Sequence, residues 1–158
     1  MCIRDRYDVT NLFALRPMLK EEAAKYGRLL QLGQMQNIVR HTRIGKSTDD
    51  FERKLRAYDL DIFKNFYSVF GNHNVDPVNN DAEAAFKAMT DHKFFLGGTI
   101  DDAIADWKDI YARVPCEYIT LIWHWAQQPK DEMLEELQLF MEKVVPELET
   151  PDFAAAAE

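Results

Sequence analysis

The sequence predicts an α/β fold that is mostly helical and contains about two parallel strands. Five segments have helical spacing or helix-start residues, and two segments are rich in β-branched and aromatic residues. Along the chain these segments come in the order helix, strand, three helices, strand and helix. Because a strand, a helical crossover and a second strand are typical of βα units, we expect the two strands to pair in parallel.

The composition is that of an acidic globular chain. The 158 residues include 27 Asp and Glu against 19 Lys and Arg, which gives a formal net charge of -8, and 47% of them are hydrophobic. This balance argues against broad contact with nucleic acid, because phosphate binding requires clustered Lys and Arg. No apolar run approaches the roughly 18–20 residues that span a bilayer. Since two cysteines cannot build a disulfide framework, we expect a reducing, cytoplasmic location.

The chain divides into three parts. Residues 1–6 are charged and aperiodic, and we expect them to be a non-native lead-in that takes no part in the fold. Residues 7–149 hold all the predicted helices and strands. Residues 150–158, which end in four alanines and a glutamate, are expected to form a disordered tail.

The first two helices are predicted from their start and stop residues. The first covers residues 17–32, because Pro17 suits a first helical turn and Gly33 suits the position just beyond a helix. The second begins after Ser47, which is placed to cap it, with Asp50 three residues on. Its apolar residues keep helical spacing towards Gly71, and they are Phe51, Leu55, Tyr58, Ile62, Phe66, Val69 and Phe70.

A loop at residues 71–80 precedes three further helices. The third helix is expected at about 81–92, and the fourth follows Thr99, its cap, with Asp102 at the third helical position. The fifth covers 131–145 and is ended by Pro146. We predict an apolar core face and a charged solvent face for it. The core face is Met133, Leu134, Leu137, Phe140, Met141, Val144 and Val145, and the solvent face is Asp131, Glu132, Glu135, Glu136, Glu142 and Lys143.

The two predicted strands cover residues 37–44 and 118–125. The second is β-branched and aromatic without strict polar alternation, which indicates a strand covered on both faces. Two strands alone, however, leave unpaired edges and do not make a sheet that five helices can cover. We therefore expect the missing strands to lie outside this chain. The alternative is a helical bundle in which the two strand predictions are wrong.

Three stretches resemble parts of a known family. They are Asn-Ile-Val-Arg-His-Thr-Arg-Ile at 37–44 with Ser-Thr-Asp-Asp at 47–50, Phe-Leu-Gly-Gly-Thr-Ile-Asp-Asp-Ala-Ile at 95–104, and Tyr-Ile-Thr-Leu-Ile at 118–122 with Pro129 and the amphipathic helix after it. In this order they resemble the seventh strand, a glycine-led helix start, and the last strand and closing helix of the bacterial-luciferase-like, flavin-dependent oxidoreductases. The resemblance runs from about Pro17 to Glu149.

This resemblance implies the C-terminal part of a (β/α)8 TIM barrel, a fold that typically takes about 250 residues. It implies a monooxygenase that uses dioxygen and FMN, reduced by a flavin reductase, to oxidise a small-molecule organic substrate. Relatives that use the deazaflavin F420 for hydride transfer are an alternative. In this family most flavin contacts come from earlier strands, so we expect the fragment alone to be inactive. Assembly into a homo-oligomer is left open.

The candidate site residues follow the last strand, because barrel chemistry takes place at the carboxyl ends of the strands. Alternation puts Thr120, Ile122 and His124 on one face, which is the more polar and the better candidate for the barrel interior. His124 is the catalytic candidate, as a hydrogen-bond partner or proton shuttle. Trp123, His124 and Trp125 are the substrate-pocket candidates. The simpler interpretation is a satisfied loop histidine between two packing tryptophans.

Other chemically active residues have simpler structural explanations. Arg40 and His41 lie mid-strand on opposite faces, and a buried arginine there most simply forms an internal salt bridge. The turn at residues 97–99 offers a helix start to an anion, but a capped N-terminus explains it without a ligand. Cys116 is interpreted as a small buried residue. No metal site is predicted, because two further histidines lack partners at metal-ligand spacing, namely His73 and His92.

Two hypotheses from different classes follow. One is the flavin-dependent enzyme fragment, and the other is a non-enzymatic helical module that binds a partner through exposed aromatic residues. Residues 118–125 separate the two hypotheses. A strand with an open edge favours the enzyme fragment, and a helix within a bundle excludes it.

Overall fold

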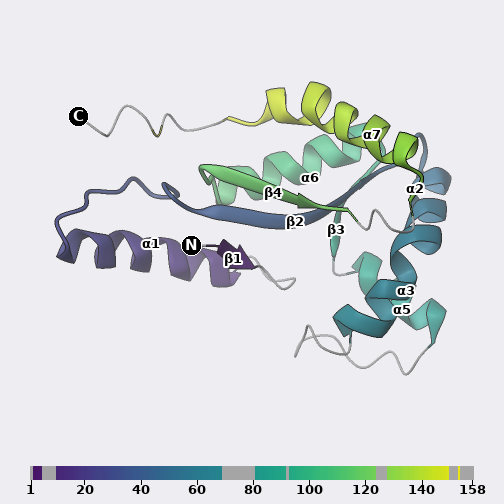
Figure 1. The fold of residues 1–158 in the computed structure, drawn as a ribbon, viewed down its shortest axis with the longest axis horizontal. Coiled ribbons are helices and arrows are strands. Elements are labelled where there is room, and N and C mark those ends of the chain that lie inside the picture. Colours follow the sequence, from purple (N-terminus) through teal and green to yellow (C-terminus); the bar gives the residue numbers. More distant parts are fainter. Residues whose placement is uncertain are drawn as a thin grey trace.

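The structure is a computed structural model that describes residues 2–4, 10–68, 81–91, 93–123, 128–149 and 153. These residues form a small parallel sheet with helices packed around it (Figure 1). The strands are β1 (Cys2–Arg4), β2 (Asn37–Ile44), β3 (Phe95–Gly98) and β4 (Tyr118–Ile122). The helices are α1 (Thr10–Lys25), α2 (Thr48–Lys54), α3 (Leu60–Ile62), α5 (Ala82–Asp91), α6 (Ile100–Arg113) and α7 (Lys130–Leu139). π-helical turns continue three of them, at Leu55–Asp59, Phe63–Tyr67 and Phe140–Val144, and a 3-10 turn follows at Val145–Glu147.

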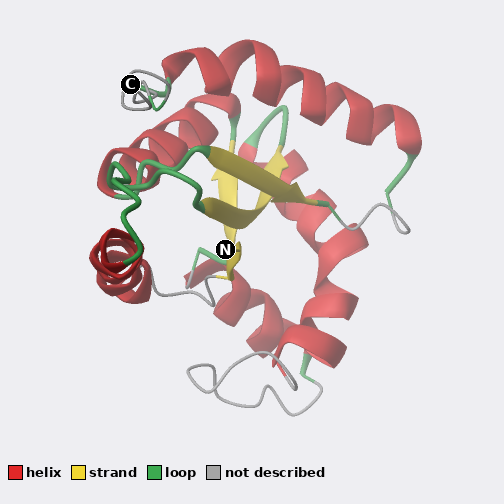
Figure 2. Ribbon diagram, turned by 60° about the vertical axis from the view of Figure 1, so that its left-hand side comes forward, coloured by secondary structure: helices red, strands yellow, loops and turns green. Residues whose placement is uncertain are grey.

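β2 is the central strand of the sheet. β4 pairs with one of its edges along residues 37–41, and β1 and β3 share the other edge, along residues 37–39 and 41–44. All three pairings are parallel, and Figure 2 shows the strands in the middle of the molecule with helices around them. The predicted α/β class and the parallel pairing of the two predicted strands are therefore confirmed, and β2 has the predicted bounds.

Two strands are missing from the sequence-based prediction. β1 lies in the segment that we expected to take no part in the fold, and its pairing with β2 contradicts that expectation. β3 overlaps the turn predicted at residues 97–99, and local propensity does not indicate it because it has four residues, two of them glycine. Gly97 has φ 148°, and a Cβ on it would lie 1.9 Å from the carbonyl oxygen of Arg43. Only glycine lets β3 approach β2 this closely, so here glycine permits a strand instead of ending one.

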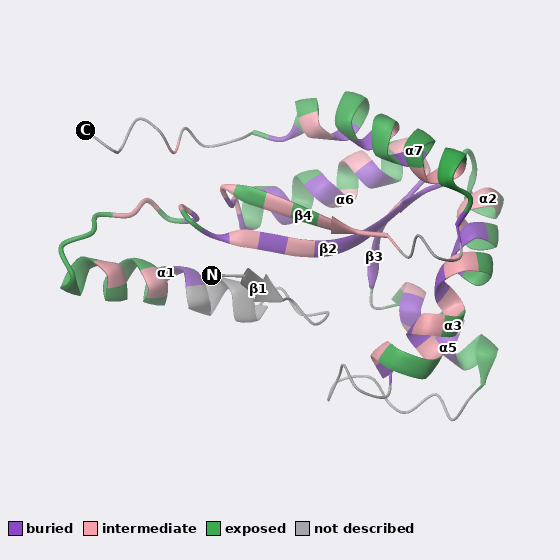
Figure 3. Ribbon diagram, viewed as in Figure 1, coloured by how far each residue is buried: buried purple, intermediate pink, exposed green. Residues whose placement is uncertain are grey.

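β4 differs from the prediction in length and in coverage. It ends at Ile122, and only one of its faces is covered by described residues (Figure 3). Ile119 and Leu121 pack against the main core, whereas Tyr118, which is 57% exposed, and Thr120 face outwards. The sequence predicts coverage on both faces, and the described residues cover one of them. Because the segment is a strand, the all-helical bundle is excluded.

α1 begins and ends seven residues before the predicted helix. Pro17 lies inside α1, not in its first turn. The helix ends at Lys25 because Gly27 adopts a left-handed backbone with φ 74° and donates its N–H to the carbonyl oxygen of Ala24. The glycine that terminates the helix is thus Gly27. Gly33 instead lies against the carbonyl oxygen of Pro115, where its missing side chain leaves room.

The second helix starts as predicted, since the Ser47 hydroxyl accepts a hydrogen bond from the backbone N–H of Asp50. Two π-helical turns then change the phase of its buried face. Asp59 and Phe63 are fully buried, and Phe66, predicted to be in the core, is 46% exposed. A prediction of the buried face from regular α-helical spacing therefore fails after the first π-helical turn.

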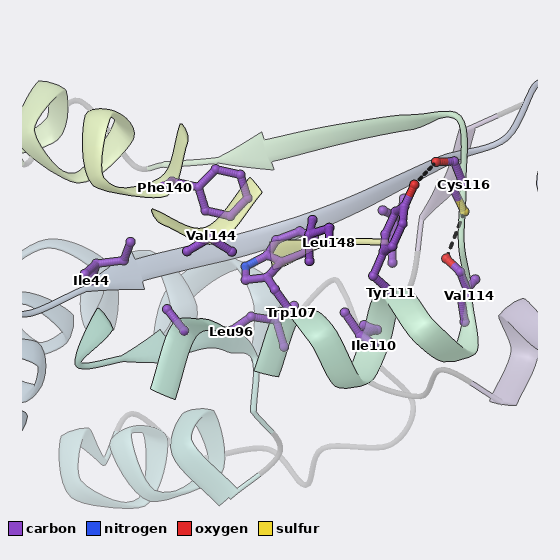
Figure 4. Packing of buried hydrophobic residues seen from close by; sticks show 12 residues of the cluster. Ile44, Leu96, Trp107, Ile110, Tyr111, Val114, Cys116, Phe140, Val144 and Leu148 are labelled. Atoms are coloured by element: carbon purple, nitrogen blue, oxygen red, sulfur yellow. Dashed lines mark hydrogen bonds between the residues drawn. The ribbon is translucent and has the colours of Figure 1, made fainter. Parts of the chain in front are cut away.

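The main core lies between β2 and β4 on one side and α6 and α7 on the other (Figure 4). Trp107 of α6 is fully buried, donates its indole N–H to the Thr42 hydroxyl at 3.0 Å, and meets the Phe140 ring edge-on at 5.2 Å. The Tyr111 hydroxyl donates to the carbonyl oxygen of Cys116. A second cluster packs α5 and the segment after α2 against β3, and it consists of Leu55, Phe63, Ala85, Met89, Phe94 and Phe95.

α7 is rotated relative to its predicted orientation. In α7 and the π-helical turn after it, Glu136, Phe140 and Val144 are fully buried, which confirms the prediction for Phe140 and Val144. Leu134, Leu137 and Met141, also predicted to face the core, are between 37% and 54% exposed. Placing Glu136 on the solvent face was therefore wrong. The rotation brings a carboxylate into the protein interior, directly over the carboxyl end of β2.

Candidate functional site

The carboxyl end of β2 carries a buried group of charged and polar side chains. We call it the Arg43 cluster, and its members are Arg43, Lys54, Asp59, Gln128 and Glu136, each at most 6% exposed. Arg43 binds Asp59 through two parallel hydrogen bonds, with Nε donating at 2.9 Å and Nη2 at 2.8 Å. Its Nη1 donates to Gln128 Oε1 at 2.5 Å and lies 3.4 Å from Glu136 Oε1.

The Glu136 carboxylate contacts residues from several secondary-structure elements. Its Oε1 accepts hydrogen bonds from Gln128 Nε2 at 2.6 Å and contacts Lys54 Nζ at 3.0 Å. Its Oε2 accepts the backbone N–H of Ile44 at 3.0 Å and the indole N–H of Trp123 at 3.2 Å. One side chain of α7 therefore joins the ends of β2 and β4 to α2.

A π-helical turn explains how two members of the cluster reach it from one helix. Lys54 and Asp59 are five residues apart, a separation that an ordinary α-helix turns away from one another but a π-helical turn brings together. Lys54 also donates to the carbonyl oxygen of Ile44 at 2.8 Å. The local irregularity thus places a cation and a carboxylate on either side of Arg43.

The cluster is electrically balanced, with two cations, Arg43 and Lys54, and two carboxylates, Asp59 and Glu136. Burying unpaired charge costs several kcal/mol per ion, and this pairing offsets that cost. Every carboxylate oxygen in the cluster accepts at least one hydrogen bond or ion pair from within the protein. This arrangement suits a rigid charged support for the strand ends and leaves none of these carboxylates exposed to take a proton from a substrate.

Of the predicted pocket residues, the structure describes Trp123, which is half-buried just after β4 and bound to Glu136. His124 and Trp125 lie outside the described residues. Trp123 and Gln128, the described residues on either side of that gap, both bind the Glu136 carboxylate. The structure thus places a predicted site residue beside a charged cluster that the sequence analysis did not identify.

The second feature of the site is the uncovered face of the sheet. The prediction that Thr120 and Ile122 lie on the face opposite Leu121 is confirmed, since Leu121 packs on the core and Thr120 is exposed. Thr120 Oγ1 accepts a hydrogen bond from Asn37 Nδ2 at 2.9 Å. Asn37 lies on the central strand directly beside β4, so a polar pair marks this face.

Arg40 and His41 occupy opposite faces of β2, as predicted. Arg40 is buried and donates to the carbonyl oxygen of Lys93 at 3.3 Å. The His41 ring stacks on Phe94 at 4.2 Å and its Nε2 lies 2.9 Å from the Tyr67 hydroxyl. The salt bridge expected for Arg40 is not among its described contacts, whereas Arg43, three residues further on, pairs with Asp59 and Glu136.

The helix start at residues 97–99 is occupied by the chain's own carboxylate. Asp102 Oδ2 accepts hydrogen bonds from the Thr99 backbone N–H at 2.9 Å and hydroxyl at 2.7 Å, and the Thr99 hydroxyl accepts the Asp102 N–H. This reciprocal capping box confirms the structural interpretation of the turn. An anion would meet the Asp102 carboxylate there.

The capping box gives a pH-dependent prediction. The hydrogen bond from the Thr99 hydroxyl lowers the pKa of Asp102, so its contribution is present above the pKa of the unfolded chain and is lost as the pH falls through the folded value. In Thr99→Val we expect the pKa of Asp102, followed by NMR, to rise and the free energy of unfolding at neutral pH to fall by about 1 kcal/mol. Thr48→Val, in the exposed first turn of α2, is the control and should cost no more than about 0.5 kcal/mol. An unchanged pKa in Thr99→Val would refute this assignment.

The remaining candidates are structural or lie outside the described residues. Cys116 is buried, and its burial raises the pKa of the thiol, which fits an unreactive core residue. His73 and His92 are outside the described residues. A cavity of about 340 Å³ lies between α2, α5, β3 and α6, with an ion pair between Lys93 and Asp106 at its rim, and no member of the Arg43 cluster lines it.

Metal-binding groups, membrane-spanning helices and similarity to known proteins complete the description of the site. Within the part of the chain that the structure describes, no three His, Cys, Asp or Glu side chains come together in a way that would hold a metal ion. No described helix is both long and apolar enough to cross a membrane. No protein-family model matches the sequence, and no curated protein matches it at a significant level.

Proposed function

We propose that this chain is the C-terminal portion of a flavin-dependent monooxygenase of the bacterial-luciferase-like type. The observation that carries the proposal is the asymmetry of the parallel sheet. Helices α6 and α7 cover one face, while the other face carries the Asn37–Thr120 pair, and beside it the described residues leave Tyr118 and Thr120 exposed. In a closed barrel this second face would line the interior, where polar side chains meet a ligand.

The position of the charged cluster supports the same proposal. In parallel α/β proteins, ligands bind at the carboxyl ends of the strands. The Arg43 cluster lies at that end of β2, and Trp123 lies at that end of β4. The proposed role of the Arg43 cluster is to hold the Trp123 indole rigidly as a wall of the substrate pocket, because a pocket wall needs a support that does not move.

The described residues do not provide a phosphate site for FMN. The two buried cations of the cluster are already paired with Asp59 and Glu136, and the helix start at Thr99 is occupied by Asp102. A flavin phosphate needs free cations or free backbone N–H groups. In the proposed enzyme the phosphate is therefore held by strands that precede this chain. When bound, the flavin would supply the redox chemistry.

In the proposed barrel, the pairing along one edge of β2 would differ from the pairing in this structure. β2 and β4 are parallel neighbours, as the seventh and last strands of a barrel would be. β3, however, pairs with the other edge of β2, where the preceding strand of a barrel would lie. In the complete enzyme that strand would have to displace both β3 and β1, which pair with this edge of β2 along residues 41–44 and 37–39.

The test is a flavin titration with the 158-residue chain. Because the described residues lack a phosphate site, we expect no saturable binding of FMN at micromolar concentration, measured by flavin fluorescence and by isothermal calorimetry. F420 is titrated in parallel, since the two cofactors share the proposed fold. Stoichiometric binding of FMN at micromolar concentration would contradict the proposed division of contacts.

A further inference from the structure

A buried histidine lies on the sheet face that the proposed barrel would turn inwards. Side chains alternate along a strand, so His41 shares this face with Asn37, four residues before it on β2. Its register partner on β4 is Ile122, which lies on the same face as Thr120. Because His41 is only 9% exposed, its imidazole is a buried polar group that requires a hydrogen-bond partner.

The Tyr67 hydroxyl provides a partner, at 2.9 Å from His41 Nε2. The two rings meet edge-on at 5.0 Å, and the Phe66 ring meets the Tyr67 ring edge-on at 5.2 Å. Tyr67 is half-buried and Phe66 is 46% exposed, so the three rings lead from the interior to the surface. Tyr67 and Phe66 lie in the π-helical turn at Phe63–Tyr67, and such turns are frequent at functional sites.

The contact with His41 leaves the Tyr67 hydroxyl able to bind a ligand as well. A tyrosine hydroxyl can donate one hydrogen bond and accept two, and this contact uses one of the three. The count holds for either tautomer of His41, because the hydroxyl donates in one case and accepts in the other. Arg43, the cation two residues further along this face, is already paired with Asp59 and Glu136. The His41–Tyr67 pair therefore suits a neutral group, such as a hydroxyl, better than an anion.

We propose that Tyr67, positioned by His41, is a polar contact of the substrate pocket, and that the substrate is a small neutral aromatic molecule with a hydroxyl group. This inference rests on the proposed function, in which the face that carries His41 lines the barrel interior. The Tyr67 hydroxyl binds the substrate hydroxyl. The exposed Phe66 ring packs against the aromatic body, as aromatic rings do edge-on or offset. His41 acts through Tyr67 and is a positioning residue.

The test uses the 158-residue chain and two probes that differ by one hydroxyl group, p-cresol and toluene. Binding is followed by NMR through the backbone amide resonance of Phe66. Tyr67→Phe keeps the ring and removes the hydroxyl, so it should weaken p-cresol binding about three- to tenfold, the usual effect of one hydrogen bond. Its toluene binding should be unchanged. Tyr111→Phe removes a buried hydroxyl from the main core and is the matched control, which should change neither affinity.

His41 is tested by two replacements. In His41→Gln the side-chain amide can take the place of Nε2 and hold Tyr67, so the variant should keep most of its affinity for p-cresol. His41→Leu should weaken p-cresol binding as much as Tyr67→Phe does and leave toluene binding unchanged, whereas a purely structural role would weaken both probes alike. The inference would be overturned if the unmodified chain showed no saturable binding of p-cresol, or if Tyr67→Phe changed both affinities equally. None of these measurements involves FMN, so the flavin titration tests the proposed function separately.

Discussion

Glu136→Gln is expected to lower the free energy of unfolding by about 3–5 kcal/mol, the usual cost of breaking a buried ion pair by removing one partner. Glu136 is 1% exposed and accepts hydrogen bonds from Ile44, Trp123 and Gln128 while pairing with Lys54. Glutamine has nearly the same shape but removes the charge, so the cluster keeps two cations and one carboxylate. The measurement is urea unfolding followed by circular dichroism.

The neighbouring residue is a matched control. Glu135 lies one position earlier on α7 and pairs with Lys46 at 3.0 Å, but both side chains are largely exposed. Glu135→Gln should therefore cost about 0.5 kcal/mol or less. If Glu136→Gln does not fold, adding Lys54→Met restores the charge balance and should recover part of the stability. Equal losses from Glu135→Gln and Glu136→Gln would show that the cluster is not a buried support.

Trp107→Ala is expected to cost about 3–5 kcal/mol, because it leaves a large cavity between α6 and β2. Trp107 is fully buried, contacts the Phe140 ring and donates to the Thr42 hydroxyl at 3.0 Å. Figure 4 shows its indole among core side chains of α6 and of the residues that follow α7, among them Phe140, Val144 and Leu148.

Trp107→Phe separates the two contributions of this residue. It keeps much of the ring volume but leaves the buried Thr42 hydroxyl without its donor, which should cost about 1–3 kcal/mol. Both variants are compared by urea unfolding at the same pH. If Trp107→Ala cost no more than Trp107→Phe, packing around α6 would not be the main support of the core.

Much of the fold follows from local signals in the sequence. The run of β-branched residues at 37–44 gives β2 with its observed bounds, and Ser47 and Thr99 mark the starts of α2 and α6. These signals work because strand propensity and capping act between residues that are near one another in the chain. The parallel pairing of β2 and β4 also follows, since helical crossovers connect parallel strands.

The elements that were missed depend on contacts between distant residues. β3 exists because the backbone of Arg43 requires a glycine at residue 97, and no local propensity reveals that. α7 is rotated because burying Glu136 against Lys54 and Arg43 competes with burying its exposed leucines, Leu134 and Leu137. The π-helical turn at Leu55–Asp59 is likewise invisible to a search for helical period.

The sequence predicts only part of the candidate site, because the other part also depends on contacts between distant residues. Alternation along β4 correctly predicts that Thr120 lies on the face opposite Leu121. The sequence does not reveal the Arg43 cluster, because Asp59 and Glu136 occupy helix positions typical of solvent-facing carboxylates. A usable signal was the second arginine, Arg43, within the predicted strand at residues 37–44, since an arginine that is buried there requires carboxylate partners.

The most direct test of the proposed function compares two proteins in one flavin assay. One is the 158-residue chain, and the other is the product of the coding sequence extended upstream by about 150–200 residues of βα units. We expect stoichiometric FMN binding and substrate-dependent consumption of dioxygen with reduced FMN from the longer protein alone. The proposal would be contradicted by an upstream sequence without βα units, or by a longer protein that binds no flavin.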